Sequence, residues 1–584
     1  MNNEVDRRQM KDLEVLRRAF RYIRPHLSKF AIAFILLFIN VALEIVLPII
    51  ITTTTGKLGL KEINIIAILV LVGTYLLLSA INILFSYFLS ILLQKTGQEI
   101  VVKLRDDVFT HIESLSISQF NEIPVGKLVT RVTNDTVAVS DLFSNLIVNF
   151  LRNILLVLGT FIIMFVVSWQ LTLFMLIFVA LVLTISLIFR YVAKKVFREE
   201  RKEISLMNTF LSENLSGMKV TQVFNQEERK KEEFEEHNTK LRKAAYKITL
   251  AFAFYRPGIS FLYILAVATC FALGIPYVEK GIINAETFLL FYMYLDHFFG
   301  PIQNLSDLLN GFQRALSASE RLFTLMDLKP TVVDEEDAIE LDSFKGKIEF
   351  DHVFFAYEEE NWILKDVSFL VNPGETVAFV GQTGAGKTTI LSLIVRNYDI
   401  QKGHIRIDDI DIKKIKLQSL RKCIGQMLQD VFLFSGNIES NIRLRNEDIS
   451  EEQILEACKY VNADHFINKT PLGLKEEVRE NGINFSAGQR QLLSFARTIV
   501  RKPSILILDE ATANIDSETE LLIQESLNKM KSIGTMLVVA HRLSTIKDAD
   551  KIIVIDDGKI LEEGNHEELL KNKGYYYQMW SLIE

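Results

Sequence analysis

The chain has 584 residues, of which 49% are hydrophobic and 40 are Phe, and its mean hydropathy is positive. This composition excludes a wholly soluble enzyme, although the second half of the chain is ordinary in composition. The net charge of −7 gives no support to nucleic-acid binding. The widely spaced Cys270, Cys423 and Cys458 predict neither a metal site nor a disulfide framework.

Long apolar runs occupy the first part of the chain, residues 1–327, and each is long enough for a helix that crosses a bilayer. The runs cover residues 30–51, 65–93, 142–168, 171–191, 248–273 and 288–309. The pattern predicts an all-α transmembrane domain with six spanning helices. Apolar residues also recur at helical spacing in the two long charged connections, which are therefore expected to be helical extensions of the spans.

Basic residues are concentrated at the N-terminus and in the two long connections, residues 95–131 and 194–247. The positive-inside rule places both connections and both termini in the cytoplasm. We therefore expect a multi-pass protein of the cytoplasmic membrane.

Glu44, Asp296 and His297 are ionisable residues inside the predicted spans, where charge is costly. They could face a central cavity and bind a cationic part of a substrate, or they could pair between helices. Pairing is favoured for Asp296 and His297, whereas both alternatives stay open for Glu44.

An acidic linker, residues 328–346, leads to a second domain at 347–584. This domain contains GQTGAGKT at 381–388, between a predicted buried strand at 375–380 and a predicted apolar helix at 389–394. Strand, glycine-rich loop and helix form the phosphate-binding pattern GxxxxGK[ST], which predicts an α/β P-loop domain that binds ATP. Lys387 should reach the β and γ phosphates, and the Thr388 hydroxyl should hold Mg²⁺. The binding residues predicted from this loop are Gly381, Thr383, Gly384, Ala385, Gly386, Lys387, Thr388 and Thr389.

A second apolar strand, at 504–508, is followed by two carboxylates. Asp509 is expected in the Mg²⁺ shell, and Glu510 stands where a general base could polarise the attacking water. The alternative is an ordinary pair of surface carboxylates, which seldom follows an apolar strand directly.

With these motifs in this order, the chain resembles the ATP-binding cassette (ABC) exporter half-transporters of the multidrug-efflux type. In particular it resembles the catalytic-glutamate subunit of heterodimeric bacterial multidrug exporters. The resemblance implies a RecA-like cassette and gives four further residues a role. Tyr357 would stack on adenine, Gln429 would sense Mg²⁺ and touch the membrane domain, Asp516 would contact the partner cassette, and His541 would be the switch at the γ phosphate.

The family signature LSGGQ reads Phe485-Ser486-Ala487-Gly488-Gln489 here. In the family this segment opens a helix and offers its N–H groups to the nucleotide of the other cassette. The Ala487 methyl group is expected to cost space and backbone freedom. Ser486, Ala487, Gly488 and Gln489 would therefore lend a weakened signature to the partner's nucleotide, which favours a heterodimer with one degenerate site over a homodimer.

The resemblance implies an ATPase coupled to export of amphipathic or hydrophobic compounds by alternating access. Its expected cofactors are ATP and Mg²⁺, and its expected partners are a second half-transporter, membrane lipid and small amphipathic substrates. Transmission is expected at coupling segments before Phe120 and around 212–218. A lipid or lipid-linked flippase and a homodimeric exporter are the alternatives, and the predicted spans disfavour a soluble P-loop ATPase acting on DNA or protein.

Overall fold

The computed structural model describes residues 10–58, 65–358, 361–427, 430–509, 517–539 and 546–583. The chain divides into two compact units. The helical unit comprises Met1–Glu113 and Val125–Leu328, and the α/β unit comprises Ser114–Pro124 and Lys329–Glu584. A short segment of the first half of the chain therefore belongs with the second unit.

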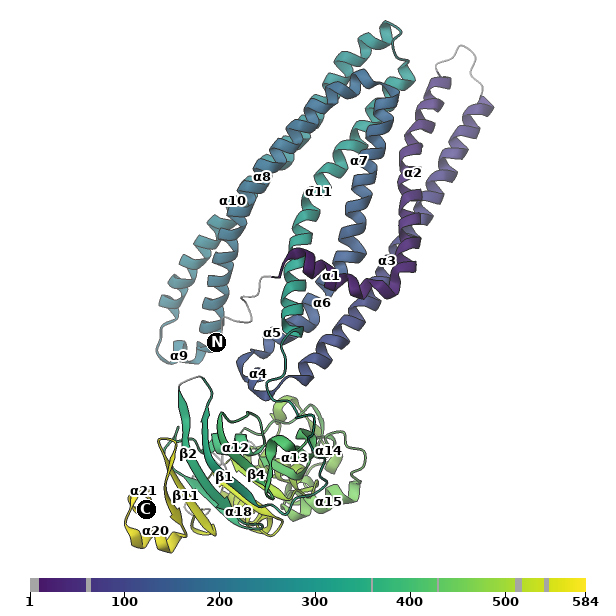
Figure 1. Ribbon diagram of the computed structural model, residues 1–584. Helices are drawn as coiled ribbons and strands as arrows, with labels where there is room; N and C mark the ends of the chain where they lie inside the picture. The colour runs from purple at the N-terminus through teal and green to yellow at the C-terminus, as the bar shows by residue number, and fades with distance from the viewer. Residues whose placement is uncertain are drawn as a thin grey trace. The chain divides into compact units, whose positions relative to one another are not determined.

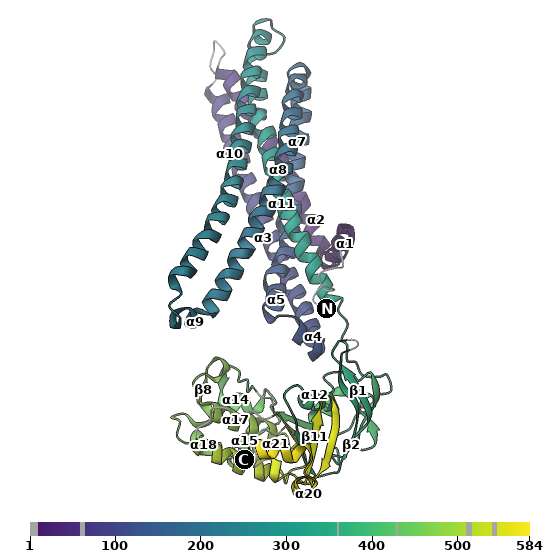
Figure 2. The same ribbon diagram turned by 90° about the vertical axis from the view of Figure 1, so that its left-hand side faces the viewer.

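Long helices dominate the helical unit (Figure 1). They are α2 (Leu27–Leu58), α3 (Ile65–Ser114), α7 (Ile147–Val167), α8 (Trp169–Ser216), α10 (Glu227–Glu279) and α11 (Ala285–Met326). The shorter helices are α1 (Asp12–Ile23), α5 (Val125–Thr130), α6 (Thr136–Asp141) and α9 (Met218–Val223), with one turn of 3-10 helix, η1 (Arg24–His26), and two π-helical segments, η2 (Arg131–Asp135) and η3 (Leu142–Leu146). Helices α8 and α10 lie side by side in both views and are joined by α9 (Figures 1 and 2).

Within the described residues, five helical segments are long and apolar enough to cross a membrane: 13–57, 65–114, 125–167, 169–216 and 227–279. The sixth predicted span lies in α11, where Glu286, Asp296 and His297 lower the hydropathy, and it stays a prediction. The 53 residues of α10 span about 80 Å, far more than the roughly 30 Å of a bilayer core. The expected helical extension of the spans is thus confirmed.

The α/β unit contains two main sheets. The six-stranded sheet has the order β12-β11-β3-β10-β9-β6, in which β12 pairs antiparallel to β11 and the other pairings are parallel. Its strands are β3 (Thr376–Val380), β6 (Ile424–Met427), β9 (Ile505–Asp509), β10 (Thr535–Val539), β11 (Lys551–Asp556) and β12 (Lys559–Gly564). Such a sheet binds ligands at the carboxyl ends of its parallel strands.

An antiparallel sheet of order β2-β1-β4-β5 packs beside it. Its strands are β1 (Ile348–Ala356), β2 (Trp362–Val371), β4 (Lys402–Ile407) and β5 (Ile410–Asp411); β7 (Gly436–Asn437) and β8 (Glu477–Val478) form a separate two-stranded pair. The helices are α4 (Ile117–Glu122), α12 (Lys387–Ile394), α13 (Leu417–Cys423), α14 (Ile438–Arg443), α15 (Glu451–Tyr460), α16 (Asp464–Ile467), α17 (Ala487–Ile499), α18 (Ser517–Met530), α20 (His566–Asn572) and α21 (Tyr575–Ile583), with turns η4 (Ile412–Lys414), η5 (Gly473–Lys475) and η6 (Glu480–Gly482). The predicted α/β class is confirmed.

The segment predicted as a linker, 328–346, lies mostly along the α/β unit. Ile339 bridges to Ile415, and its N–H donates to the carbonyl oxygen of Lys414 at 2.8 Å. The carboxylate of Asp334 accepts the N–H of Leu417 at 2.9 Å. This segment is therefore held by specific hydrogen bonds and is not a free tether.

Candidate nucleotide-binding site

The glycine-rich loop connects β3 to α12, as the sequence predicts. Gly386 has a φ of +107°, a left-handed conformation that residues with a side chain rarely adopt. A Cβ atom on Gly381 would lie 2.0 Å from the carbonyl oxygen of Ile555, so a side chain cannot be accommodated there without a backbone shift. The loop is thus shaped by glycine at the carboxyl end of a buried parallel strand.

Lys387 is buried and folds back into this loop. Its Nζ donates to the carbonyl oxygens of Gly381 at 2.7 Å and Gln382 at 2.8 Å. Burial lowers the pKa of Lys387, and the charge of Asp509 acts in the opposite direction. A cation enclosed by a glycine-rich turn at a helix N-terminus fits a polyphosphate, which would replace the carbonyl oxygens as its partner.

Thr388 and Asp509 meet although they are far apart in sequence. The Thr388 hydroxyl lies 3.5 Å from a carboxylate oxygen of Asp509, which ends β9. Hydroxyl and carboxylate oxygens are hard donors of the kind that Mg²⁺ prefers. The donor set therefore fits Mg²⁺ bound together with nucleotide phosphates.

Tyr357 directly follows β1 and reaches the first turn of α12. Its hydroxyl lies 3.1 Å from the Thr389 hydroxyl, and its ring packs edge-on against Phe355 and Tyr398 with centroids 4.9 and 5.0 Å away. Burial raises the pKa of Tyr357, yet the residue remains 46% exposed. A fixed, half-exposed aromatic ring beside the phosphate loop is suited to stacking on a nucleobase.

The signature segment begins α17. Ser486 is the N-cap residue: its hydroxyl accepts the N–H of Gln489, and the Gln489 side chain accepts the N–H of Ser486. Ala487 lies in the first turn with a helical backbone, so its methyl group costs no backbone freedom within this chain, contrary to the expectation from sequence. Phe485, which stands where the family signature has leucine, is buried and packs edge-on against Phe466, so the aromatic ring is accommodated there.

Lys387, Thr388, Asp509, Tyr357 and Thr389 are thus brought together around the phosphate loop. In the described part of the chain, no hydrogen bond joins residues 486–489 to that loop. Gln429, Glu510, Asp516 and His541 lie outside the described residues, and their roles stay predictions.

The polar residues of the spans differ in their surroundings. Glu44 forms an ion pair with Arg152 of α7, 2.9 Å away. Of the two alternatives for Glu44, the structure therefore shows pairing between helices. The only sequence signal for this partner was an arginine inside the apolar run 142–168. His297 contacts the carbonyl oxygen of Met293 on its own helix. Asp296 is exposed, forms no ion pair within the described residues, and interacts electrostatically with Tyr263 of α10.

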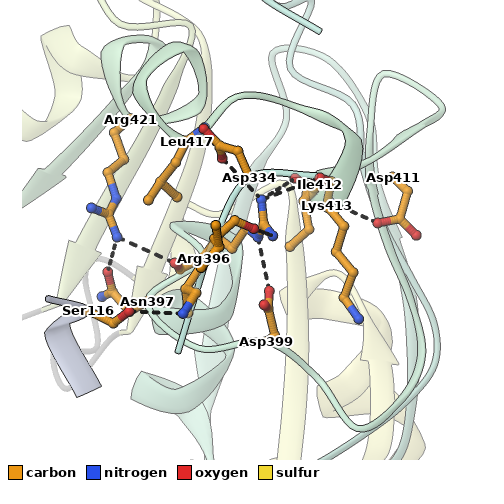
Figure 3. Close-up of polar contacts among 12 residues, drawn as sticks. Ser116, Asp334, Arg396, Asn397, Asp399, Asp411, Ile412, Lys413, Leu417 and Arg421 are labelled. Atoms are coloured by element: carbon orange, nitrogen blue, oxygen red, sulfur yellow. Dashed lines mark hydrogen bonds and ion pairs between the residues drawn. The ribbon is translucent and has the colours of Figure 1, made fainter. Parts of the chain in front are cut away.

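The sequence reasoning missed how the coupling segment is attached. Transmission is expected before Phe120, which stays a prediction; the residues there form helix α4 (Ile117–Glu122), and nothing in the sequence indicates that this helix belongs to the α/β unit. The side-chain amide of Asn121 donates to the hydroxyl of Tyr398 at 3.0 Å. The Ser116 hydroxyl accepts the N–H of Val332 at 2.9 Å, beside the buried Arg396 (Figure 3).

Comparisons with known proteins agree with this geometry. Residues 30–302 match the ABC transporter transmembrane region, and residues 364–513 match the ABC transporter family. The chain is 35% identical to the multidrug resistance-like ATP-binding protein MdlB of Buchnera aphidicola, over 97% of this chain and 98% of that protein. It is 33% identical to the ATP-dependent lipid A-core flippase of Syntrophus aciditrophicus, over 98% and 94% of the two chains.

Among solved structures, a bacterial Atm1-family ABC exporter with ATP bound superposes with a TM-score of 0.80 at 26% identity, covering 96% of this chain and 98% of that one. Both domains are therefore matched by full-length relatives in the same order. The chain belongs to the ABC transporter family and is an exporter in which a helical membrane domain precedes an ATP-binding domain, an ATPase coupled to transport.

Proposed function

We propose that the chain exports amphipathic or hydrophobic compounds across the cytoplasmic membrane, as in multidrug efflux, and that it works as one half of a dimer. The observation that carries this proposal is the exposed carboxylate of Asp296 on α11, whose charge acts on Tyr263 of α10 and which lies one helical turn after Tyr292. A carboxylate facing lipid would be costly, so it is expected to face a hydrated path. A carboxylate with neighbouring aromatic rings favours an amphipathic cation.

ATP would bind at the phosphate loop, with Lys387 on the β and γ phosphates and the Tyr357 ring on adenine. Thr388 and Asp509, assisted by Gln429, would hold Mg²⁺, which neutralises charge on the phosphates when bound. Glu510 would accept a proton from the attacking water, and His541 would hold the γ phosphate in place.

Two chains are required, because the signature segment 486–489 would contact the nucleotide of the partner cassette, together with Asp516. Nucleotide-driven closure of the cassettes would shift the membrane domains from inward-facing to outward-facing. We infer a heterodimer in which this chain supplies Glu510 to the competent site and Ala487 to the degenerate one. The basic connections support a cytoplasmic location for both cassettes and both termini.

Lipid or lipid-linked substrate export is the second candidate function. It is favoured by the full-length similarity to a protein named as a lipid A-core flippase. An exposed carboxylate in the membrane domain is less suited to an anionic headgroup, which places this function second.

The proposal is tested with inside-out membrane vesicles that contain the chain, alone or co-expressed with a candidate partner. The vesicles are given Mg-ATP and either ethidium, an amphipathic cation, or a fluorescent phospholipid. We expect ATP-dependent ethidium accumulation that Asp296→Asn reduces several-fold, whereas phospholipid movement without ethidium accumulation would favour the flippase. Subunit stoichiometry of the active assembly decides between heterodimer and homodimer.

A further inference from the structure

Helix α4 and its N-cap residue Ser116 are attached to other described residues of the α/β unit by four side-chain hydrogen bonds. Three of them reach the segment 329–332: Gln119 donates to the carbonyl oxygen of Lys329 at 3.0 Å, the hydroxyls of Ser118 and Thr331 lie 2.8 Å apart, and Ser116 accepts the N–H of Val332. The fourth is donated by the side-chain amide of Asn121 to the hydroxyl of Tyr398. Through Tyr398, this bond connects α4 to the residues of the nucleotide-binding site.

Tyr398 is in contact with the proposed adenine-stacking residue. Its ring meets that of Tyr357 edge-on, with centroids 5.0 Å apart and an interplanar angle of 82°. Tyr357 in turn lies at hydrogen-bonding distance from Thr389 in the first turn of α12. A continuous series of contacts therefore runs from the phosphate-loop helix through Tyr357 and Tyr398 to Asn121 of α4.

The turn that carries Tyr398 is held firmly. It follows directly after α12, and its first residue, Arg396, is 1% exposed. Arg396 pairs with Asp399 at 2.9 Å and donates to the carbonyl oxygen of Val333 at 2.9 Å (Figure 3). Arg396 and Asp399 flank Tyr398 and hold the turn that carries it, and the Tyr398 ring packs against Tyr357, so the ring is constrained both by this turn and by Tyr357.

We propose that Tyr398 is a positioning residue that transmits occupation of the nucleobase site at Tyr357 to the coupling helix α4. The inference rests on the proposed function, since it takes Tyr357 to be the residue on which adenine stacks. Stacking restricts the Tyr357 ring, the edge-on contact orients Tyr398, and the Tyr398 hydroxyl holds Asn121. Nucleobase binding is thereby sensed by α4 separately from the phosphates.

The test is hydrogen exchange of the peptide covering residues 114–124 in the full-length chain in lipid nanodiscs, with and without a Mg²⁺-bound non-hydrolysable ATP analogue. In the wild type we expect the analogue to slow exchange of this peptide about threefold or more. Tyr398→Phe keeps the ring and removes only the hydroxyl, so it should lose most of this protection while nucleotide affinity changes less than about twofold.

Two further variants sharpen the result. Asn121→Ala removes the other partner at an exposed position and should lose the same protection, with no further loss in the double variant. Tyr460→Phe is the matched control, because it likewise removes only a tyrosine hydroxyl that forms a hydrogen bond, here one donated to the carbonyl oxygen of Lys529 at 2.6 Å, and Tyr460 lies away from α4 in sequence, on α15. It should respond as the wild type does.

Mg-triphosphate, which lacks the base, completes the design. At saturation it should leave the α4 peptide of the wild type unprotected, and equal protection by triphosphate would overturn the base-sensing route. Wild-type protection that survives in Tyr398→Phe would overturn the inference while leaving ATP binding intact. Failure of the wild type to bind the analogue at all would overturn the proposed function, and this inference with it.

Discussion

Glu44 of α2 and Arg152 of α7 form an ion pair, with 2.9 Å between carboxylate and guanidinium. Both residues lie in apolar runs, where an isolated charge is expensive. Their side chains are 25% and 37% exposed, so the pair is partly solvated. The two charges neutralise each other between neighbouring helices.

Glu44→Gln should therefore destabilise the helical unit more than the double variant Glu44→Gln/Arg152→Gln does. Removing one partner leaves a charge without its counter-ion, which we expect to cost about 1–2 kcal/mol at this partial exposure, less than for a fully buried pair. Thermal unfolding of the full-length chain in lipid measures the difference. Equal losses in the single and double variants would mean that the pair contributes nothing by its charge.

The sequence predicts the loop around Lys387 but not the partner of Arg152, and this difference has a physical cause. The phosphate loop is a local structure: the spacing of its glycines, Lys387 and Thr388 contains most of its geometry, and the flanking apolar runs locate β3 and α12. Arg152 and Glu44 are 108 positions apart, and their meeting depends on how two helices pack. Helical periodicity predicts each helix but not its neighbour or rotation, so the pairing could not be read from the sequence.

The same reasoning applies to α4 and to Ala487. A family resemblance places a coupling segment near Phe120, but the bond from Asn121 to Tyr398 joins residues 277 positions apart. For Ala487, the cost of a methyl group was inferred from the glycine it replaces. The local backbone is helical, so within this chain the residue is unstrained, and any cost must come from contact with a partner's nucleotide.

Lys387 should make ATP binding sensitive to alkaline pH. Only its protonated form attracts phosphates, and burial lowers its pKa below that of an ordinary lysine. Affinity should stay constant at neutral pH and fall as the pH rises through this lowered pKa. Binding of a fluorescent ATP analogue between about pH 7 and 10 measures this fall in affinity.

Two variants serve as controls for Lys387. Lys387→Ala should weaken binding about tenfold or more at neutral pH, because a charge-assisted contact is removed. Lys387→Arg stays charged throughout the range and should flatten the profile. An unchanged profile in the arginine variant would show that another group titrates.

Glu510→Gln should abolish most ATP turnover in the assembled transporter while preserving ATP binding. The amide has the same shape but cannot accept a proton, and general-base catalysis typically contributes 10²–10⁴-fold, so we expect a loss of about 100-fold or more. Steady-state phosphate release and nucleotide affinity are both measured. Glu451→Gln, at an exposed position in the first turn of α15, is the control and should hydrolyse normally. Normal hydrolysis by Glu510→Gln would exclude Glu510 as the base.

Arg396→Met should destabilise the α/β unit strongly. The substitution removes the ion pair with Asp399 and the bond to the Val333 carbonyl oxygen from a fully buried site, which we expect to cost about 3–5 kcal/mol. Arg406→Met is the matched control, because Arg406 pairs with Glu349 and Asp351 near the surface, where ion pairs contribute little, and its loss should cost much less stability than the loss of Arg396. Thermal unfolding compares the two variants. Hydrogen exchange of residues 329–346 should rise only in the Arg396 variant, and unchanged exchange there would contradict the assignment.

Ala487→Gly restores the glycine of the family signature and tests whether the methyl group weakens the partner's ATP site. Within this chain the change should cost up to about 1 kcal/mol, because glycine is the poorer helix former in the first turn of α17. A higher ATPase rate in the variant would therefore have to come from contact with the nucleotide bound to the other cassette, since stability changes in the opposite direction. We expect such a rise when this chain is paired with a different half-transporter. The ATPase rate is measured in lipid, both in the otherwise unchanged assembly and in an assembly that also carries Glu510→Gln. Glu510→Gln silences the ATP site to which this chain supplies its general base. Turnover that remains in the double variant Ala487→Gly/Glu510→Gln therefore comes from the other ATP site, which residue 487 completes. If Ala487→Gly leaves turnover unchanged in both backgrounds, the methyl group is tolerated, and the argument for a degenerate site loses its physical basis.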